Sequence, residues 1–72
     1  MDLDYIKPSF QTRPYRPSEV CRIRDRWQSF LYIKHGAKPV DIYVDQEDNL
    51  VMLFMKNETR ELYDAYRKYQ LK

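Results

Sequence analysis

The fold of this protein is decided by residues 40–55, which read VDIYVDQEDNLVMLFM. In the first five of these residues apolar side chains alternate with more polar ones, the pattern of a half-buried strand. Residues 45–49 are polar and favour a turn, and residues 50–55 are all apolar, which indicates a second strand. The short connection predicts an antiparallel hairpin. The unbroken apolar run places the strand at 50–55 in the centre of a sheet.

A third strand is predicted upstream, at residues 20–24. Cys21 and Ile23 alternate there with Arg22 and Arg24, so that one face is apolar and the other basic. If this segment pairs with the strand at 50–55, a right-handed crossover gives a sheet in which all neighbours are antiparallel.

A helix over roughly residues 26–35 is predicted between the first two strands. Asp25 is the expected N-cap, with Gln28 as its reciprocal partner, and Gly36 supplies a left-handed residue at the C-terminal end. The helical spacing predicts that Trp27, Phe30 and Leu31 form a buried stripe.

A second helix follows the strand at 50–55. Asn57 is its expected cap, and an apolar face is predicted from residues at i, i+3, i+4 and i+7, namely Leu62, Ala65, Tyr66 and Tyr69. The predicted core joins the two helices to the sheet through Trp27, Phe30, Leu31, Ile42, Leu62 and Tyr66. On this register, Phe30→Ala should cost about 3–5 kcal/mol.

Residues 1–18 are predicted to form an extended arm ahead of a β-α-β-β-α domain at residues 19–72. Pro8, Pro14 and Pro17 each fix a backbone angle and remove a hydrogen-bond donor, which excludes a helix or a central strand. The expected fold class is therefore α+β: a three-stranded antiparallel sheet packed by two helices, with an extended Pro-rich N-terminal arm.

The composition sets limits on function. The chain has 72 residues and a formal net charge of +2, which demands neither a nucleic acid nor a membrane as partner. No apolar run approaches the roughly 20 residues of a membrane span, and the acidic N-terminus does not resemble a signal peptide. The single cysteine fits a reducing compartment, so a cytoplasmic location is expected.

The sequence offers no convincing catalytic or metal site. Cys21 and His35 are the sharpest candidates for nucleophilic chemistry, but a cysteine on a strand is more often an inert core residue. One cysteine and one histidine cannot complete a four-ligand zinc site. The acidic residues Asp41, Asp45, Glu47 and Asp48 lack the spacing of a calcium loop. We therefore expect a protein that is not an enzyme, with no metal, no cofactor and no small-molecule substrate.

Four features of the sequence form a recognisable set: an aromatic-rich helix ending His35-Gly36, the strand around Asp41-Ile42-Tyr43, the apolar strand at 50–55 and a closing helix with Glu61-Leu62-Tyr63-Asp64. Together they resemble small uncharacterised β-α-β-β-α proteins of Gram-positive bacteria and their phages. The resemblance covers about two thirds of the chain. It implies a phage or mobile-element accessory protein and carries no catalytic residues.

An exposed apolar face is predicted on the sheet. Two short helices should cover only one face, which leaves Tyr43, Val51, Leu53 and Met55 on the other. Such a patch must be covered, either by the arm through Tyr5, Ile6 and Phe10 or by a second molecule. The second molecule is slightly favoured, because so small a chain has few other sources of stability.

Two other surfaces are candidates for binding. Tyr15 lies within Pro14-Tyr15-Arg16-Pro17, a PxxP pattern, although an ordered extended arm is the simpler interpretation. The basic residues Arg13, Arg16, Arg22, Arg24 and Arg26 are interleaved with aromatic ones, as in proteins that bind single-stranded nucleic acid.

The leading hypothesis is a protein-binding module, either a homodimer or a factor that inhibits or redirects a host protein. The alternative is a small nucleic-acid-binding protein that uses the arginine-rich face. The sequence names neither the partner nor the biological process.

Overall fold

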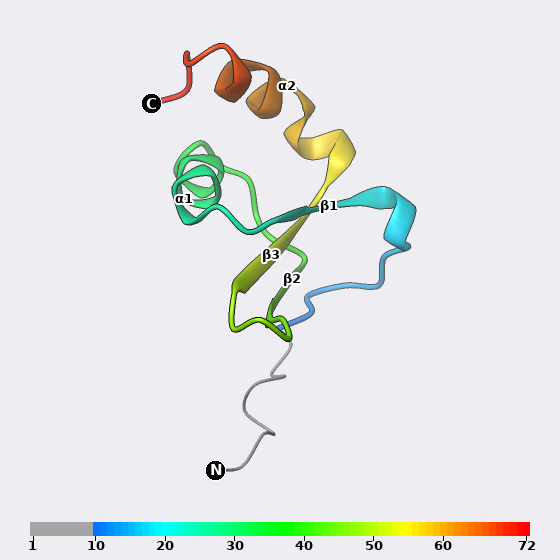
Figure 1. The fold of residues 1–72 in the computed structure, drawn as a ribbon. Helices are drawn as coiled ribbons and strands as arrows, with labels where there is room; N and C mark the ends of the chain where they lie inside the picture. The colour runs from blue at the N-terminus through cyan, green and yellow to red at the C-terminus, as the bar shows by residue number, and fades with distance from the viewer. Residues whose placement is uncertain (1–9) are drawn as a thin grey trace.

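The computed structural model describes residues 10–72. Its main elements, in chain order, are β1 (Val20–Ile23), α1 (Arg26–Lys34), β2 (Asp41–Val44), β3 (Leu50–Met55) and α2 (Lys56–Arg67) (Figure 1). The expected α+β fold and its β-α-β-β-α order are confirmed. None of the helices in this described part is long and apolar enough to cross a membrane.

The sheet is antiparallel and has the order β1-β3-β2, with β3 in the centre as its apolar run predicts. Cys21 lies opposite Phe54 on one side of β3, and Ile42 lies opposite Met52 on the other. Because side chains alternate along a strand, these four residues share one face of the sheet. Both faces of β3 are packed, which explains why the strand has no polar positions.

Both helices pack on the face that carries Phe54. Tyr32 of α1 meets the Phe54 ring edge-on, with 5.3 Å between ring centroids. Leu62 and Tyr66 of α2 pack against the same cluster, which also includes Ile23. This side of the sheet is therefore the main helix-covered core.

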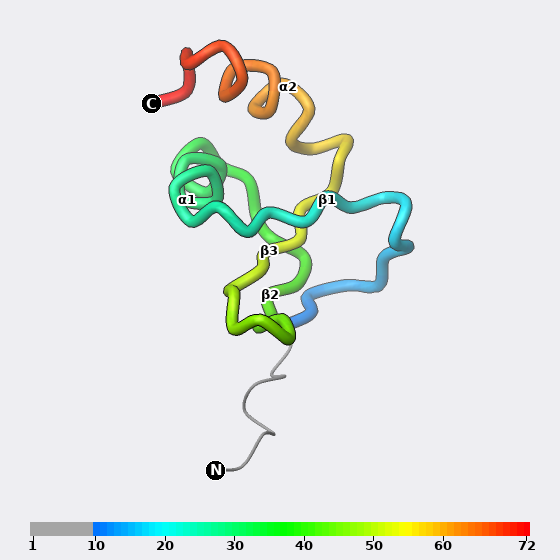
Figure 2. The backbone as a smooth tube through the Cα atoms, in the orientation of Figure 1, coloured from blue at the N-terminus to red at the C-terminus, as the bar shows by residue number. Residues whose placement is uncertain are grey.

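The N-terminal arm covers the opposite face. Val51 and Leu53 form a second cluster there with Val20 and Val40, and Tyr15 packs against it. The arm also runs beside β2, since the backbone N–H groups of residues 10 and 12 donate to the carbonyls of residues 42 and 40 over 3.0 and 2.8 Å. Figure 2 shows this segment passing around the sheet to reach β1.

One buried polar contact fastens the arm. The Tyr15 hydroxyl donates to Asp41 Oδ2 over 2.6 Å, and Asp41 is buried beneath it. The hydrogen bond to Asp41, together with burial, raises the pKa of Tyr15 to about 12. Of the other arm residues expected to cover this face, Phe10 is exposed, and Tyr5 and Ile6 lie outside the described residues.

The predicted buried stripe of α1 is confirmed for Leu31 but wrong for Trp27 and Phe30. Ser29, Leu31 and Tyr32 are buried, whereas Trp27 and Phe30 are exposed. The apolar residues of the helix are spread around nearly all of its circumference, so their spacing does not select one face. The face with Tyr32 is buried because its ring stacks edge-on with Phe54 and its hydroxyl accepts a hydrogen bond from Gln28.

The predicted helix ends are partly confirmed. The Asp25 carboxylate caps α1 by accepting from the backbone N–H groups of Trp27 and Gln28, and Gly36 has a φ of 98°. The Gln28 side chain does not complete the cap, since it donates to Tyr32. Asn57 is not a cap either, because α2 begins at Lys56 with no loop after β3.

Candidate functional site

The predicted partner-binding patch on the sheet is not exposed. Val51 and Leu53 are 0% and 4% exposed, and Tyr43 and Met55 are half-buried around them. The expectation of an exposed apolar face is therefore wrong, because Tyr15 and neighbouring side chains of the same chain pack over it. Tyr15 itself contributes to this packing, as the simpler interpretation of its PxxP segment proposed.

The structure does not bring the five predicted arginines to one surface. Arg13 on the arm pairs with Glu58 at the start of α2, over 2.7 Å. Arg22 lies exposed on the outer strand β1, and Arg24, just beyond that strand, turns toward the β2–β3 turn. Arg16 and Arg26 are exposed, the first before a short 3₁₀ helix (Pro17–Glu19) and the second at the start of α1. The expectation that the prolines exclude any helix within residues 1–18 is wrong for this turn, because proline is tolerated at the first position of a helix.

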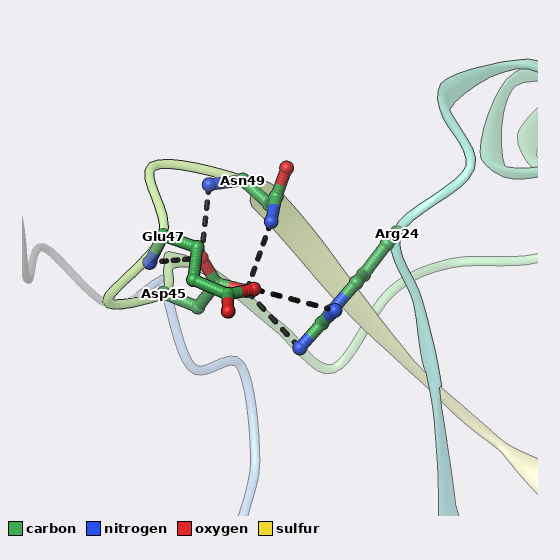
Figure 3. A network of polar contacts seen from close by, with 4 residues as sticks. All are labelled: Arg24, Asp45, Glu47 and Asn49. Atoms are coloured by element: carbon green, nitrogen blue, oxygen red, sulfur yellow. Dashed lines mark hydrogen bonds and ion pairs between the residues drawn. The ribbon is translucent and has the colours of Figure 1, made fainter.

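Arg24 contacts two acidic side chains of the turn between β2 and β3 (Figure 3). Its guanidinium lies 3.4 Å from Asp45 Oδ2 and 3.7 Å from Glu47 Oε1. Asp45 Oδ1 accepts from the backbone N–H groups of Glu47 and Asn49, both over 2.9 Å. These backbone hydrogen bonds, that of Asn49 foremost, lower the pKa of Asp45, and the positive charge of Arg24 adds to the effect. The network holds the hairpin turn closed.

The remaining residues that were considered for catalysis or metal binding contact different parts of the fold. The Cys21 thiol contacts the Phe54 carbonyl over 3.5 Å, whereas the His35 ring contacts the Lys72 carbonyl over 2.7 Å. Asp41 lies under Tyr15, away from the network of Asp45. Within residues 10–72, no three histidine, cysteine or acidic residues form a group that could hold a metal ion.

A different surface stands out on the helices. Trp27 and Phe30 are 60% and 50% exposed, and their rings stack with 5.2 Å between centroids. Ile33, one turn further along α1, is also exposed. We call these three residues the aromatic surface of α1.

A groove of about 770 Å³ continues from this surface between α1 and the end of α2. Its apolar and aromatic lining consists of Trp27, Leu31, Tyr63, Tyr66, Tyr69 and Leu71. The Tyr66 hydroxyl of α2 donates to Asp25 Oδ2 at the start of α1 over 2.9 Å, and this hydrogen bond joins the two helices beside the groove. That hydrogen bond lowers the pKa of Asp25 and raises the pKa of Tyr66.

The charged side chains of this groove are all basic. Lys34, Arg67 and Lys72 line it, and among the residues that the structure describes no acidic side chain does so. The Arg67 guanidinium lies over the Tyr63 ring, 5.6 Å from its centroid. The lining therefore combines aromatic rings with basic side chains, and the Asp25 carboxylate lies behind it, hydrogen-bonded to Tyr66.

A larger cavity, of about 870 Å³, lies between the arm, the segment before β2 and the start of α2. Both signs of charge line it, since Arg13, Lys38 and Arg60 face Glu58 and Glu61. The Arg13–Glu58 pair neutralises part of that lining. Size alone favours this cavity, but the aromatic groove has the more consistent chemistry.

No family model matches the chain, and neither a curated protein nor a solved structure is significantly similar to it.

The sequence did not identify this groove as a site. Trp27 and Tyr66 were expected in the core and Tyr69 on the apolar face of the second helix, because aromatic residues at helical spacing usually pack inward. Lys34, Arg67 and Lys72 were not among the predicted binding residues. One signal was present in the composition: seven of the 72 residues are tyrosine, a residue type that is enriched at binding surfaces.

Proposed function

We propose that this protein is a non-enzymatic protein-binding module and that the aromatic surface of α1 is part of its binding face. The stacked pair Trp27 and Phe30 carries the proposal. Both rings are at least half exposed, although burying apolar surface is the main source of stability for a small domain. Exposed aromatic residues that cluster are typical of protein interfaces, where Trp in particular contributes most of the binding energy.

The rigidity of the surface supports the same proposal. Leu31 and Tyr32 anchor α1 to the sheet side of the molecule, so Trp27 and Phe30 are presented on a fixed backbone. A preorganised surface loses less conformational freedom on binding than a mobile one. A cytoplasmic, reducing location is part of the proposal and rests on the single cysteine. The resemblance to phage and mobile-element proteins stays a prediction.

The nucleic-acid alternative has less support. Arg13 is paired with Glu58, and Arg24 with Asp45 and Glu47 of the β2–β3 turn. A nucleic-acid interface usually gathers its cations on one face, and these arginines lie on the arm, on β1 and at the start of α1.

The test is comparative capture from cells that express the chain, using the parent, a Trp27→Ser/Phe30→Ser variant and a Phe10→Ser control. Phe10 is also exposed but lies beside β2, away from α1. The parent and the control should capture the same protein in stoichiometric amounts, and the double variant should lose it while keeping its circular dichroism spectrum. Binding is then repeated with the purified partner. Equal capture by the folded double variant would refute the proposal.

A further inference from the structure

Tyr69 adopts a backbone conformation that tyrosine normally avoids. Its φ is 58°, directly after the end of α2. The N–H of Gln70 donates to the Ala65 carbonyl over 2.8 Å, and the N–H of Tyr69 donates to the Tyr66 carbonyl over 3.1 Å. This pair of bonds is a Schellman motif, in which the left-handed position is usually glycine because a side chain there is strained.

Burial within the chain does not offset this strain. The Tyr69 side chain is 91% exposed. Residues held in strained conformations persist where the surroundings enforce them, and they gather at binding and catalytic sites. A glycine at this position would relieve the strain, so the presence of a large exposed ring points to a use for the ring.

The ring stands at the groove between α1 and the end of α2. It lines that groove with Trp27 and Tyr63, next to the basic side chains of Lys34 and Arg67. The aromatic lining suits an apolar side chain of a partner, and the basic side chains suit carboxylates on either side of it. Opposite charges across an interface steer and orient the partner.

We propose that this groove binds an acidic segment of a partner protein that also carries an aromatic or aliphatic side chain, with Tyr69 as the anchor on this chain. The proposal rests on the protein-binding function proposed above and specifies its partner. A protein segment is favoured over single-stranded nucleic acid because two ring faces that could stack on bases are already covered. Arg67 covers one face of Tyr63, and Phe30 covers one face of Trp27.

The first experiment selects ligands from a displayed library of random peptides on the immobilised full chain. The enriched peptides should carry net negative charge and at least one aromatic or aliphatic residue. A parallel selection on a Lys34→Glu/Arg67→Glu variant should lose the preference for acidic peptides. Enrichment of neutral or basic peptides, no enrichment at all, or an acidic preference that survives the charge reversal would overturn the proposal. Tight retention of single-stranded DNA by the same groove would also overturn it.

The second experiment measures the affinity of one selected peptide for variants of Tyr69. Tyr69→Gly should weaken binding by about tenfold or more, as truncation of an interface anchor does, and should raise the melting temperature because the strain is removed. Tyr69→Asn, which tolerates the same backbone conformation, should also weaken binding, and Tyr69→Phe should retain it. Unchanged binding by Tyr69→Gly would exclude an anchoring role.

The two proposals can fail separately. If Trp27→Ser/Phe30→Ser abolishes capture of the cellular partner while Tyr69→Gly and the charge reversal do not, the protein-binding function stands and the groove inference fails. If neither the double variant nor the Tyr69 variants alter capture, both fail.

Discussion

At the scale of single residues, Asp41 is a buried acidic side chain on the arm-covered face. The residue is 4% exposed, and its carboxylate accepts a hydrogen bond from the Tyr15 hydroxyl over 2.6 Å. A buried carboxylate is costly unless hydrogen bonds satisfy it. The Tyr15 hydroxyl therefore stabilises the fold in addition to the apolar packing of its ring.

We expect Tyr15→Phe to lower the free energy of unfolding by about 1.5–3 kcal/mol at pH 7, the range for a hydrogen bond to a charged group. Urea denaturation measures it, with Tyr43→Phe as the matched control, since Tyr43 is also half-buried and packs against the same cluster. An equal loss in both variants would mean that the hydroxyl of Tyr15 has no special role.

The same variant changes the alkaline pH dependence. The pKa of Tyr15 is about 12 in the folded chain and about 10 when unfolded. The folded state therefore holds its proton more tightly, so this contribution to stability is complete below pH 10 and is lost as the pH rises to about 12. The parent should lose more stability over that range than Tyr15→Phe does.

At the scale of elements, α1 shows what helical spacing can and cannot predict. Its extent and its N-cap Asp25 follow from the sequence. Its buried face does not, because Trp27, Phe30 and Ile33 offer an apolar stripe as good as the one that is buried. Packing against Phe54 selects the face with Tyr32, and that contact is a property of the assembled fold.

The corrected register gives a direct prediction for α1. Leu31→Ala should cost about 2–5 kcal/mol, because Leu31 is buried. Phe30→Ala should cost only about 1 kcal/mol, mainly the stacking with Trp27. Thermal or urea unfolding of the two variants measures the difference. A loss near 3–5 kcal/mol for Phe30→Ala would restore the sequence-based register and remove the main support for the proposed binding face.

At the scale of the whole molecule, the arm acts as a third layer. It covers the face of the sheet that the helices leave, and its residues 10 and 12 hydrogen-bond along the outer side of β2. Of the two candidates for covering this face, the structure shows the arm there, through Tyr15 rather than Phe10. The second molecule stays a prediction.

Deleting residues 1–16 should therefore destabilise the domain strongly, because it exposes Val51 and Leu53 to water. The shortened chain should also bind a hydrophobic dye and self-associate in light scattering. Deleting only residues 1–9 is the control, since it leaves Tyr15 and the described backbone contacts in place. A monomer of parental stability after the longer deletion would contradict the role given to the arm.

The sequence predicted the element order, the central strand β3 and the left-handed Gly36, because each depends on local patterns or on a continuous apolar run. It did not predict the exposed Trp27 or the strained Tyr69. The exposure of Trp27 depends on which side of α1 the tertiary packing buries. The backbone conformation of Tyr69 depends on how the chain turns at the end of α2. The candidate site therefore includes aromatic residues that were predicted to lie in the core, namely Trp27, Phe30 and Tyr66.

The central position of β3 also affects the order in which the chain can fold. The hairpin of β2 and β3 pairs neighbouring segments, which takes on the order of microseconds, whereas β1 must close a much longer loop to reach the same strand. During synthesis the arm and β1 leave the ribosome first, but the strand on which they pack is made later. Until residue 55 has emerged, the N-terminal third of the chain has no native surface on which to fold.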